Sequence, residues 1–71
     1  MAKVVKAHIT GTVWKIEVKV GDKVEVGTTV AILESMKMEM PVEAEEAGVV
    51  QEVLCKEGQA VTEGDVLVVL S

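Results

Sequence analysis

The residue with the clearest chemical potential is Lys37, which lies near the midpoint of the chain between Met36 and Met38. Ser35 and Glu39 flank these three residues. A lone lysine is usually a solvated surface charge, and methionine usually fills gaps in a core. One lysine between two methionines, at the point where the chain passes from its first half to its second, indicates instead an amine presented for acylation. We therefore interpret Lys37 as an attachment point for a cofactor.

No other group of residues suggests catalysis. His8 has no cysteine or histidine partner for a metal ion and is expected on the surface. No serine, cysteine or aspartate constellation is typical of nucleophilic catalysis, and the glycines are spaced as turns rather than as a phosphate loop. We expect no catalytic residues and no metal site.

The halves of the chain are repeats. Shifting the sequence by 37 residues superimposes it on itself without a gap. Glycines mark backbone positions that need positive φ or close approach, so matched glycines predict matched turns. The pairs include Val5 with Val42, Ala7 with Ala44, Gly11 with Gly48, Val13 with Val50, Gly21 with Gly58, Val24 with Val61, and Gly27 with Gly64.

Each half is expected to form four short strands and no helix. In the first half these strands cover approximately residues 3–9, 12–20, 23–26 and 29–34, and their counterparts follow from residue 38. Apolar residues alternate with charged ones from Trp14 to Val20, which is typical of a strand with one wet face. The stretch 42–53 has some helical character, but Gly48 interrupts it and the repeat favours strand and turn.

Two such halves, related by a pseudo-twofold axis, predict an all-β fold: a flattened antiparallel barrel or sandwich of two four-stranded sheets. The crossing between the halves lies at Ser35–Met38. Tight two-residue hairpins usually contain Asn-Gly or Asp-Gly, because their central residues adopt positive φ. If Met36 and Lys37 occupy such a turn, the backbone carries strain of about 1–3 kcal/mol, which is typical of a functional position.

The run Glu34-Ser35-Met36-Lys37-Met38-Glu39-Met40 resembles the biotin-attachment motif of biotinyl domains, the biotin carboxyl carriers of biotin-dependent carboxylases. The usual core of that motif is Ala-Met-Lys-Met, and Ser35 replaces the alanine. The resemblance covers nearly the whole chain, since Gly-Asp-Lys-Val at Gly21 and Gly-Asp-Val-Leu at Gly64 also match turns of the family. It implies a barrel-sandwich hybrid with the modified lysine at a hairpin tip.

The resemblance also implies roles and partners. Lys37 would carry covalent biotin, added by a biotin protein ligase that recognises the flanking Met36 and Met38. Glu34, Ser35 and Glu39 are further candidates for contacts with the ligase or another partner. A biotin carboxylase would use ATP and bicarbonate to carboxylate the biotin, and a carboxyltransferase would pass the carboxyl group to an acceptor that these residues do not identify.

Two features depart from the family pattern. His8 and Glu45 stand where biotinyl domains often have proline. The gapless repeat leaves no room for the inserted thumb of some bacterial acetyl-CoA carboxylase carriers, so the chain resembles the thumbless type.

Two other functions compete with the biotin carrier. Lipoyl domains share the sandwich and the hairpin lysine, but they usually have aspartate where this chain has Met36. The second alternative is a noncovalent adaptor in which Lys37 is never modified. Replacing Lys37 with arginine separates a carrier from an adaptor, because arginine keeps the charge but cannot be acylated.

Size and composition support a single monomeric domain spanning residues 1–71. The net charge of −5 makes nucleic acid an improbable partner, and the longest apolar run, residues 66–70, is too short to span a membrane. The lone Cys55 suggests a small buried hydrophobe and a cytoplasmic protein. We expect Met40 to fill the core, and Trp14 to cap a thin core while partly exposed rather than to bind biotin.

Overall fold

Eight short strands form the part of the chain that the computed structural model describes, residues 3–71. They are β1 (Lys3–Lys6), β2 (Gly11–Ile16), β3 (Lys23–Val24), β4 (Thr29–Ser35), β5 (Met38–Glu43), β6 (Gly48–Val53), β7 (Ala60–Val61) and β8 (Val66–Leu70). No helix occurs within this range, and stretch 42–53 consists of strand and turn, as predicted. Residues 1 and 2 of the predicted domain lie outside the described range.

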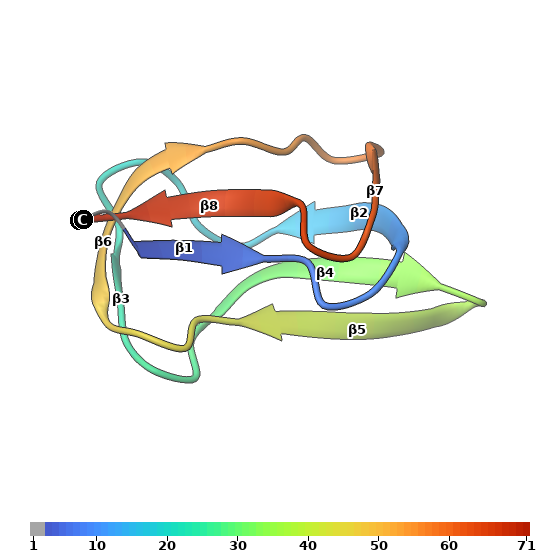
Figure 1. The fold of residues 1–71 in the computed structure, drawn as a ribbon, viewed down its shortest axis with the longest axis horizontal. Coiled ribbons are helices and arrows are strands. Elements are labelled where there is room, and N and C mark those ends of the chain that lie inside the picture. The colour runs from blue at the N-terminus through green and yellow to red at the C-terminus, as the bar shows by residue number, and fades with distance from the viewer. Residues whose placement is uncertain (1–2) are drawn as a thin grey trace.

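The strands form two antiparallel four-stranded sheets, in the orders β1-β8-β6-β3 and β5-β4-β2-β7. Shifting each strand by 37 residues converts one order into the other, so the predicted pseudo-twofold symmetry and the predicted sandwich are confirmed. Each sheet combines two strands from each half of the chain. The molecule is elongated, 32 × 18 × 17 Å, and the β4–β5 turn projects at one end of the long axis, opposite the C-terminus (Figure 1).

The turns repeat in hydrogen bonding as well as in sequence. The amide of Gly21 donates to the carbonyl of Val50 at 2.9 Å, and the amide of Gly58 donates to the carbonyl of Val13 at 2.7 Å. Gly21 and Gly58 both have positive φ, 96° and 89°. These are conformations that a Cβ atom penalises, which is why the repeat retains glycine there.

A single core fills the space between the sheets. Its buried members fall into pairs 37 positions apart: Val5 and Val42, Ala7 and Ala44, Val13 and Val50, Val24 and Val61, Val30 and Leu67, Ala31 and Val68, and Leu33 and Leu70. Cys55 is also buried, as predicted, whereas its counterpart Val18 is only half-buried. No polar or charged side chain is buried in residues 3–71, so small aliphatic side chains carry the packing.

Several strands were predicted to be longer than they are. β1 ends at Lys6 rather than residue 9, and β2 ends at Ile16 rather than residue 20. The alternation of apolar and charged residues from Trp14 to Val20 does not correspond to one strand with a buried face, since Val20 is 64% exposed. Strand β2 also contains a bulge at Trp14, where the pairing passes from Val13 opposite Leu33 to Lys15 opposite Ile32. A bulge changes the face on which the following side chains lie, and simple alternation does not reveal it.

Two predictions about individual core residues were wrong. Trp14 is partly exposed, as expected, at 48%, but the bulge places it on the outer face of its sheet, so it does not cap the core between the sheets. Met40 is half-buried and lies outside the core cluster. His8 is exposed, as expected. No helix within the described range is long and apolar enough to cross a membrane.

Candidate functional site

The β4–β5 hairpin presents Lys37 in a two-residue turn. Ser35 and Met38 form the last strand pair, and Met36 and Lys37 connect them. Met36 has a φ of 53° and Lys37 a φ of 66°, and within the described chain these are the only residues other than glycine with positive φ. Positive φ at both central residues is the signature of a type I′ hairpin turn. The expectation of a tight turn without glycine is therefore confirmed.

Strand β2 holds the base of this hairpin. Thr12 of β2 pairs with Glu34, and Gly11 lies so close to β4 that a Cβ atom there would be 2.6 Å from the carbonyl oxygen of Glu34. Glycine at position 11 thus permits the close approach of two backbones. The hairpin is supported on this side as far as Glu34, and only residues 35–38 extend beyond that support.

The side chains at the tip are open to solvent. Lys37 is exposed, Met36 is 92% exposed and Met38 is 62% exposed. Lys37 forms no hydrogen bond or ion pair with any residue in the described range. Two exposed methionines cost hydrophobic free energy that a core position would recover, so packing does not account for their presence.

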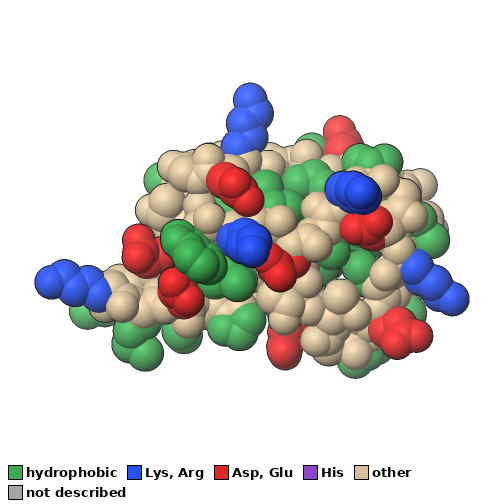
Figure 2. Space-filling view, turned by 180° about the vertical axis from the view of Figure 1, so that it is seen from behind, with side chains coloured by type: hydrophobic (Ala, Val, Ile, Leu, Met, Phe, Trp, Pro, Cys, Tyr) green, Lys and Arg blue, Asp and Glu red, His purple; other side chains and the backbone are tan. Residues whose placement is uncertain are grey.

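The strand register separates the hairpin into two faces. Leu33 pairs with Met40, and Ser35 pairs with Met38, so both methionines lie on the same side of the sheet as buried Leu33. Glu34 pairs with Glu39 on the opposite, outer side, and both are exposed. Figure 2, where the tip points to the left, shows acidic and hydrophobic side chains along this projection.

This arrangement suits covalent attachment of a carboxylate-bearing cofactor through an amide bond. The amine is exposed, has no hydrogen-bond or ion-pair partner among residues 3–71, and is held on a short turn whose backbone is defined by paired strands. Positive φ at Met36 and Lys37 costs about 1–3 kcal/mol per residue, and such strain persists where function needs the geometry. The residues present therefore fit a group carried on Lys37.

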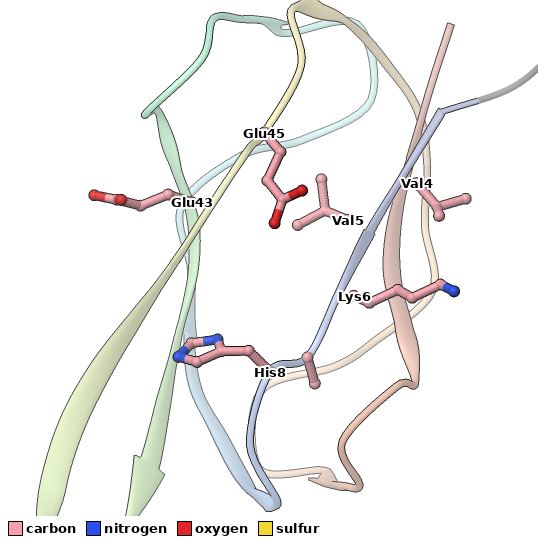
Figure 3. Close-up of a pocket in the computed structure, with 7 residues that line it drawn as sticks. Val4, Val5, Lys6, His8, Glu43 and Glu45 are labelled. Carbon is pink, nitrogen blue, oxygen red and sulfur yellow. The ribbon is translucent and has the colours of Figure 1, made fainter.

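A groove lies away from the tip, between β1 and β5. It is lined by pairs of residues related by the repeat, notably Lys6 with Glu43 and His8 with Glu45, over a floor that includes Val5. Figure 3 shows His8 and Glu45 directed toward the same space, whereas Lys6 and Glu43 point away from it. No group of three potential metal-binding side chains occurs among the residues described.

Cys55 is not available for chemistry at the surface. It is a buried free cysteine, 4% exposed, and burial raises the pKa of its thiol. A buried thiol with a raised pKa is a poor nucleophile.

The structure brings all six predicted site residues, Glu34 to Glu39, to one end of the molecule. The sequence did not reveal that these residues divide between an acidic outer face and a methionine-bearing inner face. That division depends on how β4 pairs with β5, and the length of the turn sets this pairing. The repeat counterpart Gln51 correctly indicated that Trp14 is partly exposed, but the bulge that places Trp14 on the outer face of the sheet was missed.

The fold and the hairpin define a small β domain that presents one lysine. Residues 1–70 match the family model described as "Biotin-requiring enzyme". The chain is 55% identical over 67 residues to the biotin/lipoyl attachment protein of Bacillus subtilis, covering 94% of this chain and 92% of that protein. It is 41% identical over 71 residues to the biotinylated protein TB7.3 homolog of Mycobacterium leprae, covering 100% of both. The chain belongs to the family of biotin/lipoyl attachment domains.

The same domain occurs within much larger proteins. The crystal structure of Kluyveromyces lactis urea carboxylase matches with a TM-score of 0.93 and 41% identity, covering 100% of this chain but 6% of that one. The alpha chain of human mitochondrial propionyl-CoA carboxylase is 38% identical over 69 residues, which are 97% of this chain and 10% of that protein. These relatives support a carrier domain similar to the corresponding parts of carboxylases.

Proposed function

We propose that this chain is a biotin carboxyl carrier and that a biotin protein ligase attaches biotin to Lys37. The observation that carries the proposal is the two-residue turn in which exposed Lys37 adopts positive φ without internal partners. The chain itself contributes presentation rather than catalysis. We further propose a cytoplasmic location, because buried Cys55 is a free thiol.

Each residue around the tip has a proposed role in recognition. Met36 and Met38 offer exposed, adaptable thioether side chains on either side of the amine, which a ligase surface can bury. Glu34 and Glu39 present two carboxylates on the outer face, where a basic group of the ligase or another partner can bind both. Ser35, half-buried in the last strand pair, takes the place of alanine in the motif.

The attached group would extend the reach of the domain. Biotin on the lysine side chain adds a flexible arm that reaches about 12 Å from the backbone. When bound, biotin would accept a carboxyl group from a biotin carboxylase and release it at a carboxyltransferase. The rigid hairpin holds the base of the arm while the arm moves between the two enzymes.

Met36 favours biotin over lipoate, because lipoyl domains usually have aspartate before the lysine. The M. leprae relative is named as a biotinylated protein, which agrees with this choice. The name of the B. subtilis relative includes both cofactors, so lipoylation is the second candidate.

The test is the intact mass of the protein after incubation with a biotin ligase, ATP and biotin. We expect a gain of one biotin less one water in the wild type and none in Lys37→Arg. Lys56→Arg is the matched control, because Lys56 is also exposed and should leave the gain unchanged. No gain on folded protein would refute the proposal, and a gain only with lipoate and its ligase would establish the lipoyl alternative.

A further inference from the structure

Trp14 is the only aromatic residue of the chain, and neither the fold nor the proposed attachment chemistry uses it. Its side chain is 48% exposed and is not part of the buried core cluster. Its indole donates no hydrogen bond to any residue of the described chain. Large aromatic side chains gain most from burial, so an exposed tryptophan on a small domain is expected to contact something outside the polypeptide fold.

The bulge in β2 places Trp14 on the outer face of the sheet that carries the hairpin. Val13 is fully buried and opposite Leu33, whereas Lys15 is opposite Ile32, so Trp14 is the extra residue between the two pairs. Bulges of this kind redirect a side chain next to functional sites. The other sheet has the same bulge at the same repeat position, but its extra residue is Gln51. The tryptophan therefore occurs only in the sheet with the lysine tip.

The position of Trp14 is within reach of an arm on Lys37. Trp14 is one strand away from β4, about 5 Å, and it lies level with the gap between Ile32 and Leu33, about four residues back from the middle of the turn, or about 13 Å along the strands. These two components place its backbone about 14 Å from the tip, a distance that the arm's reach of about 12 Å and the length of the indole side chain together span. Hydrophobic side chains are exposed on the surface between the tip and the middle of the molecule (Figure 2).

The neighbours of Trp14 extend the apolar surface. Ile32 is half-buried and pairs with Lys15 on one side and Pro41 on the other. Pro41 is exposed. Ile32 and Pro41 form a short aliphatic row on the outer face, and Trp14 lies beside it in the bulge next to Lys15. The Glu34–Glu39 pair forms the next row of this face toward the tip.

We propose that the indole of Trp14 is a resting site for the bicyclic ring of biotin carried on Lys37 of the same molecule. The proposal rests on the proposed function, since it requires the attached cofactor. One face of the ring system is apolar and suits the indole and the adjacent aliphatic row, while its urea group stays hydrated. Attachment holds the ring at a millimolar effective concentration, so a weak contact is sufficient to populate the resting state. The contact is reversible, and the arm leaves it to enter a partner enzyme.

The test uses Trp14 as the chain's own spectroscopic reporter. Fluorescence quenching by acrylamide is measured for unmodified and fully biotinylated protein, with modification verified by intact mass. We expect biotinylation to reduce the quenching constant about two-fold, because the ring covers one face of the indole. The single indole N–H resonance should also shift in the NMR spectrum.

The repeat provides a matched control. In Trp14→Gln/Gln51→Trp the tryptophan occupies the equivalent bulge in the sheet without the hairpin, beyond the reach of the arm. Biotinylation of this variant should leave both signals unchanged. Equal quenching of unmodified and fully biotinylated wild-type protein would overturn the resting site while leaving the carrier function intact. If the wild type shows no biotin gain in mass, the carrier function fails, and the resting site fails with it.

Discussion

Glu34 and Glu39 lie directly opposite each other on β4 and β5, in the second strand pair behind the turn that carries Lys37. Like charges at directly opposed positions of an antiparallel pair destabilise the sheet. We predict that Glu39→Gln raises the free energy of unfolding by about 0.2–1 kcal/mol at neutral pH, as measured by urea denaturation. Glu52→Gln is the control, because Glu52 is exposed and faces Val69, and it should change stability little.

The same substitution should affect modification in the opposite direction. If the two carboxylates bind a basic group of the ligase, Glu39→Gln lowers the kcat/KM of biotinylation while the domain becomes more stable. An unchanged kcat/KM would show that the pair is only a solvated feature of the hairpin.

The turn itself offers a second prediction. Met36 holds a positive φ that asparagine adopts more readily, so Met36→Asn should stabilise the domain by about 0.5–1 kcal/mol. Biotinylation of Lys37 should become slower, because an exposed thioether next to the amine is lost. Met38→Asn separates the two effects: Met38 lies in a strand, so this variant should slow biotinylation without gaining stability. A loss of stability in Met36→Asn would contradict the assignment of backbone strain to this position.

Gly11 provides a test of how the hairpin base is held. A Cβ atom there would meet the carbonyl oxygen of Glu34 at 2.6 Å, so Gly11→Ala must separate β2 from β4. We predict a loss of about 1–3 kcal/mol in unfolding free energy and faster hydrogen exchange at the hairpin amides. Gly48→Ala is the repeat-related control, since its Cβ would meet the carbonyl oxygen of Ser71 at 2.7 Å. Ser71 follows the end of β8, so this change should cost less and leave hairpin exchange unaltered.

Burial of Cys55 predicts a dependence of stability on alkaline pH. Burial raises the pKa of its thiol, whereas a cysteine in an unfolded chain titrates near pH 8.5. Below that pH both states hold the proton. Above it the unfolded chain loses the proton first, so the free energy of unfolding falls as the pH rises toward the folded-state pKa.

Cys55→Val should remove this contribution. Valine is present at the repeat-related position, Val18, and has a suitable size, so stability near pH 7 should change by less than about 1.5 kcal/mol. Denaturation curves measured from pH 7 to pH 10 should then show a smaller alkaline loss in the variant than in the wild type. Identical slopes would contradict the prediction, because they would mean that the pKa of the Cys55 thiol is the same in the folded and unfolded states.

The repeat made most of the fold predictable, because matched glycines and matched apolar positions define matched turns and one shared core. Details that depend on strand pairing were not predictable from the same pattern. Trp14 reads as part of a regular alternation, yet the bulge places it on the outer face. Met40 lies on the core side of β5, but the hairpin extends beyond the opposite sheet, so little covers its side chain.

The candidate site was likewise predictable in part: its residues could be identified from the sequence, but their arrangement could not. The motif around Lys37 identified the tip residues, and the absence of glycine predicted the strained turn. The opposed carboxylates of Glu34 and Glu39 and the inward methionines became visible only through the register of β4 with β5.

If Lys37 is the attachment site, as proposed, the exchange of strands between the two halves determines when a ligase can find it in its folded geometry. A ribosome adds Lys37 halfway through the chain, but β4 and β2 form a sheet with β5 and β7, and the opposing layer needs β6 and β8. Neither half can close a core by itself, so the tip acquires its defined geometry only after Leu70 has emerged. The proposed modification would therefore follow translation of the domain, because an incomplete chain has no finished hairpin to offer a ligase.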